Sequence, residues 1–232
     1  MATHPLQAGP ETLCFGAVIP ILYEDSRIIV IDKPSGLASQ PGEGVRVSVP
    51  DAVERDYGFR PFLVHRLDKE TAGCLALAKS AADAAWLSEL LAGDDARKVY
   101  RAAVFGRPDP ARGVLTDAVR AKGRELSAET RYRLIASAEG LSFVEAELGT
   151  GRMHQIRQHF AGAGWPIVAD DRHGDFRRNK EAAKSLGAKR LFLYAWRLSL
   201  PLGGGLELRA SLPPHFQALL ARLGLPEGAL DG

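Results

Sequence analysis

The stretch of sequence that decides the fold is Leu63-Val64-His65-Arg66-Leu67-Asp68-Lys69-Glu70-Thr71-Ala72-Gly73. An apolar pair leads into a charged segment and then into Thr-Ala-Gly, and residues 74–79 that follow predict a buried strand. Asp68 is therefore expected on a short ordered loop between two buried elements, where a scaffold holds a reactive side chain while the loop exposes it. The alternative is a solvated turn in which Arg66 and Asp68 form a local ion pair.

Two later stretches belong with the first one, and they read Lys98-Val99-Tyr100-Arg101-Ala102 and Gly151-Arg152-Met153-His154-Gln155-Ile156-Arg157. Together with His-Arg-Leu-Asp, Thr-Ala-Gly and the segments 21–25 and 32–36, they resemble the RluA-type family of RNA pseudouridine synthases. The resemblance extends over residues 21–202. Each piece is weak alone, but the set in this order is highly specific.

The hydrophobic pattern favours an α+β fold. Alternating or β-branched runs predict strands at 18–22, 27–31, 98–105, 130–135, 141–148, 191–200 and 206–212. One helix is expected with Pro50 in its first turn and Gly58 just past its end, and others from Ser80 to Gly93, from 153 to 161 and from Pro213 to Leu223. Residues 106–126 and 169–190 are expected to be excursions from the sheet. Because strands outnumber helices and often follow one another, we expect a mixed, mostly antiparallel central sheet with flanking helices. The resemblance adds a catalytic cleft, as in the pseudouridine synthase fold.

The domain organisation is expected to be simple. Residues 1–15 look like a flexible tail, and residues 16–226 are expected to form a single catalytic domain. Many members of the family that the chain resembles carry a small RNA-binding domain at the N-terminus, and we expect no separate domain of this kind before Ile21.

The composition is that of an ordinary globular protein, with 46% hydrophobic and 25% charged residues. The 30 Lys and Arg residues against 28 Asp and Glu give a net charge of only +2, so a polyanion site must come from local clustering. Two cysteines, Cys14 and Cys74, argue against a disulfide framework and for the reducing cytoplasm. The sequence has neither the apolar region of a secretory signal nor a run of membrane-spanning length.

The reaction implied by the resemblance breaks the bond from ribose to a ring nitrogen of uracil and rejoins the base through carbon. It needs no redox chemistry and no energy source, and we expect neither a cofactor nor a metal, because the sequence has no Walker loop, dinucleotide-binding glycine motif or paired Cys-x-x-Cys. It does need one carboxylate that stays ionised in a fairly dry pocket, which a nearby arginine can stabilise. The resemblance assigns these roles to Asp68 and Arg157.

Further site residues follow from the same resemblance. Tyr100 matches an active-site tyrosine, whose ring can face uracil and whose hydroxyl can meet a proton in transit. Without the resemblance, Tyr100 is an ordinary aromatic residue of an alternating strand. Leu193 matches an apolar position that packs on the target base, and is otherwise a core residue.

Contact with RNA is expected around the mouth of the site. A uridine inside folded RNA must be swung out to reach a buried carboxylate, and Arg66 matches the position that contacts RNA near the flipped base. Arg152 and His154 could bind phosphates where their helix begins, or they could be a helix cap and a satisfied polar side chain. Basic residues in 97–101, 120–133 and 172–190 are candidates for gripping the RNA backbone.

The chain departs from the family pattern at Ala72, where Ser is usual, and at Tyr194, where a histidine is usual. Tyr194 is expected to alter the lining of the pocket. Residues 167–175 are similar to the large-subunit rRNA branch, whereas the short N-terminus is similar to branches that modify tRNA. We expect 23S rRNA rather than tRNA as the substrate, and a monomer without an obligate protein partner.

Two other classes of function remain open. The first is a non-catalytic RNA-binding protein or ribosome-assembly factor on the same scaffold, although the intact set of Asp68, Tyr100 and Arg157 argues against it. The second is a metal-dependent hydrolase, whose ligands would come from His65, Asp68, His154, His159, Asp170 and Asp171. His154 and His159 are five residues apart, which misses the same-face spacing that a helical metal pair needs.

Overall fold

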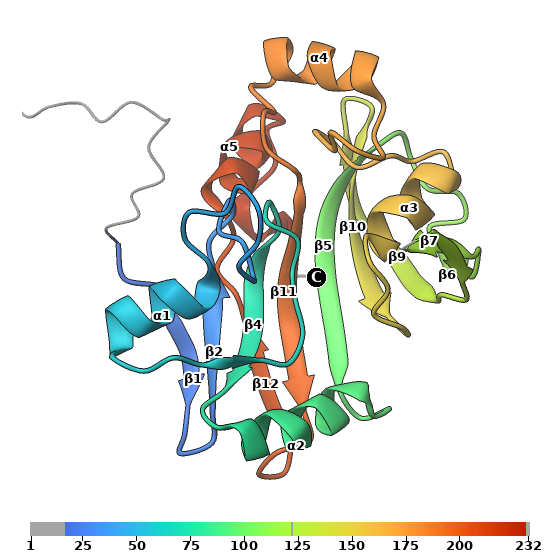
Figure 1. Cartoon of the computed structure of the whole chain (residues 1–232). Coiled ribbons are helices and arrows are strands. Elements are labelled where there is room, and N and C mark those ends of the chain that lie inside the picture. Colours follow the sequence, from blue (N-terminus) through green and yellow to red (C-terminus); the bar gives the residue numbers. More distant parts are fainter. Residues whose placement is uncertain (1–16, 122, 231–232) are drawn as a thin grey trace, which may run out of the picture.

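A single large mixed sheet runs through the middle of the molecule (Figure 1). The computed structural model describes residues 17–121 and 123–230, and the tail predicted for residues 1–15 lies outside them. The strand order along the sheet is β1-β2-β4-β11-β5-β10-β9-β6, with β3 added to β4 and β12 to β11. The strands are β1 (Ile21–Glu24), β2 (Ile28–Lys33), β3 (Phe62–Leu63), β4 (Ala72–Ala78), β5 (Arg97–Phe105), β6 (Arg112–Leu115), β9 (Thr130–Ala138), β10 (Leu141–Leu148), β11 (Leu193–Leu200) and β12 (Leu206–Arg209).

Among the described residues of this sheet, the pairing of β4 with β11 is parallel and the other pairings are antiparallel. The predicted fold class, α+β with a mixed and mostly antiparallel sheet, is therefore confirmed. Short turns join several neighbouring strands. Between β9 and β10 the turn residues Glu139 and Gly140 both have a positive φ, of 50° and 76°, which suits the right-handed twist of the two strands.

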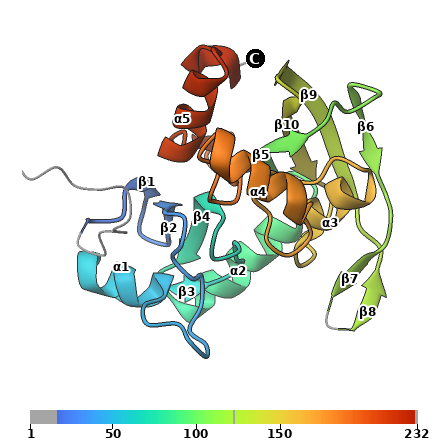
Figure 2. The ribbon, with the colours of Figure 1, turned by 90° about the horizontal axis from the view of Figure 1, so that it is seen from above.

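The helices begin and end at clear sequence signals. Helix α1 (Val49–Tyr57) has Pro50 in its first turn and ends at Gly58, which adopts the left-handed conformation. Helix α2 (Ala81–Ala92) begins at Ser80, whose Oγ accepts a hydrogen bond of 3.1 Å from the amide of Asp83. Figure 2 shows α1, α2 and α3 (Gln155–Gly162) on one side of the sheet and α5 (Pro214–Arg222) on the other.

One predicted helix starts in the wrong place. Helix α3 begins two residues later than predicted, because His154 adopts a left-handed backbone conformation with φ 54°. The helix predicted over 153–161 places Met153 on one apolar stripe with Ile156 and Phe160. Met153 instead precedes the observed helix and is 40% exposed, so its place in that stripe was wrong. Ile156 and Phe160, the other members of that stripe, are buried.

The two predicted excursions contain regular structure. In the first, β6 returns to the sheet as the partner of β9, and β7 (Val119–Ala121) and β8 (Arg124–Leu126) form a hairpin that projects from the body (Figure 2). The second contains helix α4 (Phe176–Ser185), whose first turn is capped by the carboxylate of Asp175. Only one of its residues, Ala182, is buried, so the helix lacks the apolar stripe that sequence reasoning relies on.

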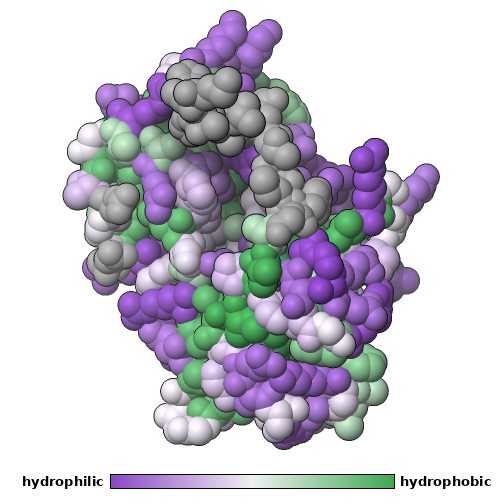
Figure 3. Space-filling model, turned by 90° about the vertical axis from the view of Figure 1, so that its left-hand side faces the viewer, coloured by the Kyte–Doolittle hydropathy of each residue, from purple (hydrophilic) through white to green (hydrophobic). Residues whose placement is uncertain are grey.

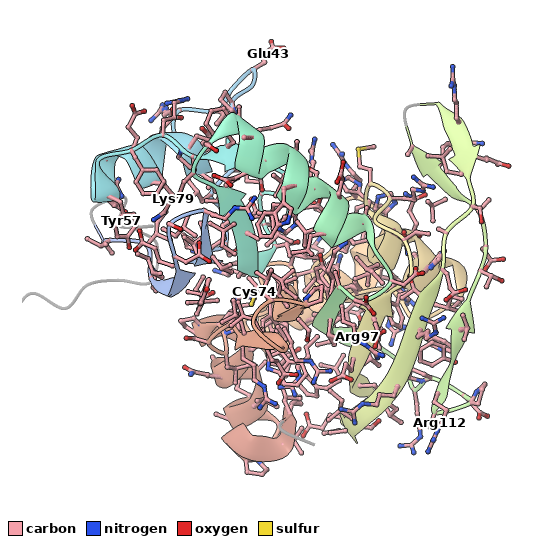
Figure 4. All side chains as sticks on the ribbon, turned by 90° about the horizontal axis from the view of Figure 1, so that it is seen from below. Glu43, Tyr57, Cys74, Lys79, Arg97 and Arg112 are labelled. Atoms are coloured by element: carbon pink, nitrogen blue, oxygen red, sulfur yellow. The ribbon has the colours of Figure 1, made fainter. Side chains whose placement is uncertain are left out.

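The core lies on both faces of the sheet, and its centre is strand β4, where every residue is buried. Cys74 belongs to this core (Figure 4), and burial raises the pKa of its thiol to about 12. The face at the left of Figure 1 is largely hydrophilic, with hydrophobic residues gathered between the polar regions (Figure 3). None of the described helices is long and apolar enough to cross a membrane.

Candidate active site

The loop that carries Asp68 connects β3 to β4. Hydrogen bonds from the segment that follows β2 hold this loop in place. The Oγ atoms of Ser35 and Ser39 donate to the carbonyls of Glu70 and Leu67, at 2.8 and 2.6 Å, and the amide of Gly36 donates to Lys69 at 2.8 Å. The residues whose carbonyls accept these bonds precede and follow Asp68 in the sequence. The loop is therefore an ordered support, as the sequence predicted, and not a freely solvated turn.

Lys33 adds to this support from inside the protein. Its fully buried Nζ donates to the carbonyls of Leu37, Pro34 and Lys69, at 2.8, 3.0 and 3.2 Å. Burial lowers the pKa of Lys33 to about 7, against the opposing charges of Glu70 and Asp68. From the sequence, Lys33 was only one member of the segment 32–36, and its hydrogen bonds between the end of β2 and the Asp68 loop were missed.

The ion partner of Asp68 is Arg157 on α3, which is 89 positions away in the sequence. Nη1 of Arg157 lies 3.1 Å from Oδ2 of Asp68, and the two side chains are 7% and 21% exposed. The local ion pair with Arg66, considered as an alternative from the sequence, is replaced by this long-range pair. A carboxylate and a guanidinium that are both shielded from water interact more strongly than a surface pair.

A second carboxylate fixes the orientation of Arg157. Asp170, only 1% exposed, accepts hydrogen bonds from Nε and Nη2 of Arg157, both at 2.7 Å. Burial would lower the pKa of Arg157, but the carboxylates of Asp170 and Asp68 raise it, so the guanidinium stays charged. Asp170 also accepts from the amides of Arg172 and His173. From the sequence, Asp170 was a candidate only as a metal ligand. Its neighbour Asp171 lies 3.4 Å from Nη2 of Arg157 and is 87% exposed.

A cavity of about 510 Å³ opens in front of Asp68. Each of the predicted site residues contributes to its lining, namely Arg66, Asp68, Tyr100, Arg152, His154, Arg157 and Leu193. Asp68 is the single carboxylate among the described residues that line it. The cavity is large enough for a nucleoside-sized ligand, and its walls mix apolar side chains with a few converging polar groups.

Tyr100 and Leu193 come from β5 and β11, which pair at the centre of the sheet. Burial raises the pKa of Tyr100, and the charge of Asp68 raises it further, so its hydroxyl stays protonated. The next residue on β11, Tyr194, points to the opposite face, where its ring packs edge-on against Phe216 at 4.8 Å. The expectation that Tyr194 alters the pocket lining was therefore wrong.

Two arginines lie at the edge of the cavity. Arg66 is exposed, and it also lines a neighbouring hollow of about 220 Å³ formed with residues 38–42. Figure 4 shows this loop ending in Glu43, which points away from the body. Arg152 lies where α3 begins, and its amide donates to the side chain of Gln155 at 3.0 Å. Both guanidinium groups can therefore meet a polyanion approaching the cavity.

The three histidines considered as metal ligands have different partners and do not converge on one point. Nε2 of His65 accepts a hydrogen bond from the amide of Ala76, at 2.9 Å, and His159 contacts Thr130 and the carbonyl of Asp117, both at 2.8 Å. His154 differs, because its Nε2 lies 3.6 Å from Oδ1 of Asp68. Among the described residues, no group of three or more His, Cys, Asp or Glu side chains is arranged to hold a metal ion.

Comparison with known proteins identifies the family of the chain. Residues 27–162, more than half of the chain, match the model of a family described as RNA pseudouridylate synthase. The chain belongs to this family. It is therefore a pseudouridine synthase, an isomerase that acts on RNA, and the activity expected from the sequence is confirmed.

Individual relatives of this pseudouridine synthase include two bacterial proteins named ribosomal large subunit pseudouridine synthase C. The one from Vibrio cholerae is 32% identical over 88% of this chain and 69% of its own length. The one from Rickettsia typhi is 35% identical over 84% of this chain and 69% of its own. A solved structure, human RNA pseudouridylate synthase domain containing 4, superposes with a TM-score of 0.75 at 28% identity, covering 89% of this chain and 94% of its own. The fold of the chain thus agrees with that of the family.

Proposed function

We propose that this pseudouridine synthase isomerises specific uridines of large-subunit rRNA, the 23S rRNA, with Asp68 as the group that begins the reaction. The observation that carries the proposal is a single carboxylate on the wall of a 510 Å³ cavity, paired at 3.1 Å with a guanidinium that is itself held by Asp170. A shielded, charged carboxylate is the nucleophile that detachment of uracil from ribose requires. The names of the Vibrio and Rickettsia relatives support rRNA as the substrate.

The residues around Asp68 have complementary roles in this proposal. Arg157 pairs with the carboxylate at 3.1 Å and orients it, and the ring of Tyr100 and the side chain of Leu193 hold the two faces of the uracil while it turns. The hydroxyl of Tyr100, which is protonated, can also donate a hydrogen bond to the base. The cavity is a volume in which a detached base can rotate and present carbon 5 to the sugar.

Binding of the RNA takes place at the rim. The target nucleotide leaves its stack to enter the cavity, and Arg66 fills or props the gap that it leaves. Arg152 and His154 lie across the cavity from Arg66 on the α3 side, where Arg152 can contact phosphate. We further propose that the protein acts as a monomer in the cytoplasm, without an obligate protein partner.

Release of tritium from RNA labelled at carbon 5 of uracil tests the catalytic assignment. We expect Asp68→Asn to abolish release while RNA binding persists, because the amide cannot act as a nucleophile. Asp171→Asn is a matched control, since Asp171 is 87% exposed and should leave the rate within about twofold of wild type. Wild-type activity in Asp68→Asn would end the proposal.

Mapping pseudouridines in a strain that lacks the gene tests the substrate. We expect one or a few pseudouridines to disappear from 23S rRNA and to return with the wild-type gene but not with Asp68→Asn. A loss confined to tRNA would overturn the rRNA assignment. Rescue of a growth defect by Asp68→Asn as well as by wild type would instead support a non-catalytic role in ribosome assembly.

A further inference from the structure

Two histidines face one another beside the proposed catalytic carboxylate. Nδ1 of His154 lies 2.9 Å from Nε2 of His173, and the planes of the two rings meet at 75°. The other nitrogen of His154, Nε2, lies 3.6 Å from Oδ1 of Asp68. The second oxygen of Asp68, Oδ2, is the one that Arg157 contacts. His154 also lines the cavity that the uracil would enter.

The short contact between the rings fixes where the protons can be. A hydrogen bond between two imidazole nitrogens needs one N–H and one lone pair, so the facing nitrogens share a single proton. The charged groups around the pair are Asp68 on its loop, Arg157 on α3, and Asp170 and Arg172 on the segment before α4. Burial lowers the pKa of both histidines, so the two rings are neutral near pH 7.

The carboxylate selects between the two neutral arrangements. If the shared proton were on Nδ1 of His154, the lone pair of its Nε2 would face the negative Oδ1 of Asp68, which is repulsive. If His173 donates the proton, Nε2 of His154 carries its own hydrogen and directs it at the carboxylate. The second arrangement is favoured by simple electrostatics, and it turns His154 into a hydrogen-bond donor at the cavity wall.

The structure also explains how His173 is held in place. Its backbone amide donates to Oδ1 of Asp170 at 2.8 Å, and Asp170 is the same carboxylate that orients Arg157. The next residue, Gly174, lies so close to the chain that a Cβ atom there would come within 2.3 Å of the carbonyl of Asp170. One compact segment therefore positions both groups that face Asp68, namely Arg157 directly and His154 through His173.

We propose that His173 is a positioning residue that fixes His154 in the Nε2–H form. At 3.6 Å from Asp68 this N–H is not held in a close hydrogen bond, and it donates to a carbonyl oxygen of the detached uracil. When the bond between ribose and the ring nitrogen breaks, the electron pair stays on the base and spreads onto its carbonyl oxygens. A fixed N–H beside the cleavage site stabilises that charge without any rearrangement of the protein. The inference rests on the assignment of Asp68 made above, and it gives His154 a part in catalysis in addition to binding.

The tautomer can be measured directly. In protein labelled with ¹⁵N, long-range proton–nitrogen spectra distinguish a protonated ring nitrogen from an unprotonated one, and the His154→Gln variant identifies the His154 signals. We expect wild-type His154 at pH 7.5 to carry its proton on Nε2. In His173→Leu we expect the fraction of the Nδ1–H form to rise, because the donor to Nδ1 has been removed and only the charge of Asp68 still favours Nε2–H.

Kinetics supply the second readout. Removal of one preorganised donor to a developing charge costs about a hundredfold in kcat, and we expect that decrease in His154→Ala. His173→Leu should lower kcat at least about tenfold and leave KM within about twofold, because only the orientation of the donor is disturbed. His173→Gln is the matched control, since its amide N–H can replace the ring N–H, and it should recover most of the rate.

Either of two results overturns the inference. One is a proton on Nδ1 of His154 in the wild-type protein, and the other is wild-type kcat in a folded His173→Leu variant. Should His173→Leu fail to fold, the tautomer in the wild-type protein decides alone. If Asp68→Asn is inactive and either of these results is found, the proposed roles of His154 and His173 are rejected and the proposed function remains.

Discussion

Arg157 divides its guanidinium between two carboxylates that differ sharply in environment. Asp170 takes Nε and Nη2 in a bidentate pair and is buried, whereas Asp68 takes Nη1 and keeps one side open to the cavity. The planar fork of an arginine allows this division, which a lysine could not reproduce. The buried pair thus sets the angle at which the third nitrogen meets Asp68.

Asp170→Asn tests this arrangement. Breaking a buried ion pair by removing one partner costs about 3–5 kcal/mol, so we expect the free energy of unfolding in urea to fall by about 3 kcal/mol. Tritium release should fall more than about tenfold, because Arg157 loses the support that aims it at Asp68. Asp171→Asn should change stability by less than about 0.5 kcal/mol. Wild-type stability and rate in Asp170→Asn would show that Asp68 alone orients the guanidinium.

His65 makes stability depend on pH. Burial, aided by the charge of Lys98, lowers the pKa of His65 to about 3, whereas an unfolded chain protonates histidine near 6.5. Between these values the unfolded chain binds a proton that the folded protein excludes, so the stability present above pH 6.5 is lost as the pH falls. Because the ring is partly exposed, the loss by pH 5 should be at most about 2 kcal/mol.

His65→Asn provides the comparison, since its side-chain oxygen can still accept from the amide of Ala76. Urea denaturation of both proteins at pH 7.5 and pH 5 should show wild type losing up to about 2 kcal/mol more than the variant. Equal losses would mean that the imidazole is protonated in the folded protein.

Among individual residues, the sequence predicted those that belong to recognisable motifs. Asp68, Tyr100 and Arg157 were expected together, and the structure places all three on one cavity. Asp170, His173 and Lys33 were missed as parts of the site. Their importance arises from hydrogen bonds across loops, and in the sequence Asp170 and His173 are simply members of a charged run.

The backbones of β4 and β11 approach each other closely at Gly73. These two strands run parallel, with Ala72 opposite Tyr194 and Gly73 opposite Ala195. Gly73 has φ 111°, and a Cβ atom there would lie 2.2 Å from the carbonyl oxygen of Ala195. The last residue of the Thr-Ala-Gly motif is therefore required by close backbone contact directly after the Asp68 loop.

Gly73→Ala should be among the most damaging single substitutions in the chain. The clash is with backbone, so the strands must separate, and we expect a loss of at least about 4 kcal/mol or failure to fold. Gly164→Ala is the matched control, because Gly164 has φ 83° with nothing near its Cβ position and should cost only about 1–2 kcal/mol. Thermal and urea denaturation of both variants would measure the difference, and equal effects would contradict the close approach of the two strands.

Elements with local signals were predicted well, and elements without them were not. Gly58 at the end of α1 and Ser80 at the start of α2 located these helices correctly, because both signals lie directly beside the helix in the sequence. Helix α4 has a single buried residue, and β6 is a short edge strand that depends on β9 for its hydrogen bonds. The parallel pairing of β4 with β11 could not be read from either strand alone.

The net charge of the whole molecule is only +2, so attraction of RNA must come from basic residues that are clustered near the cavity. The β7–β8 hairpin projects from the body and carries the exposed residues Arg120 and Arg124. Gln158 on α3 ties this hairpin down, accepting from the amide of Arg120 at 2.9 Å and donating to its carbonyl at 3.2 Å. The hairpin is thus anchored to the same helix that carries Arg157, where RNA entering the cavity would meet it.

A variant with both Arg120→Ala and Arg124→Ala should bind RNA more weakly, with kcat unchanged at saturation. The slope of log affinity against log salt should become shallower by about 0.7–0.9 for each RNA phosphate that the variant no longer neutralises. Arg222→Ala on α5, which Figure 2 shows on the opposite side of the molecule, is the control and should leave the slope unchanged. Identical slopes in all three proteins would exclude the hairpin from the RNA interface.

Strand β11 has a consequence for how the protein is made. It lies between β4 and β5 in the sheet, although both of those strands precede it by about a hundred residues in the chain. During translation the two halves of the sheet must therefore wait, each with an unpaired edge, until β11 emerges from the ribosome. Such edges invite pairing with neighbouring nascent chains, so the period before residue 200 is synthesised is when aggregation competes most strongly with folding.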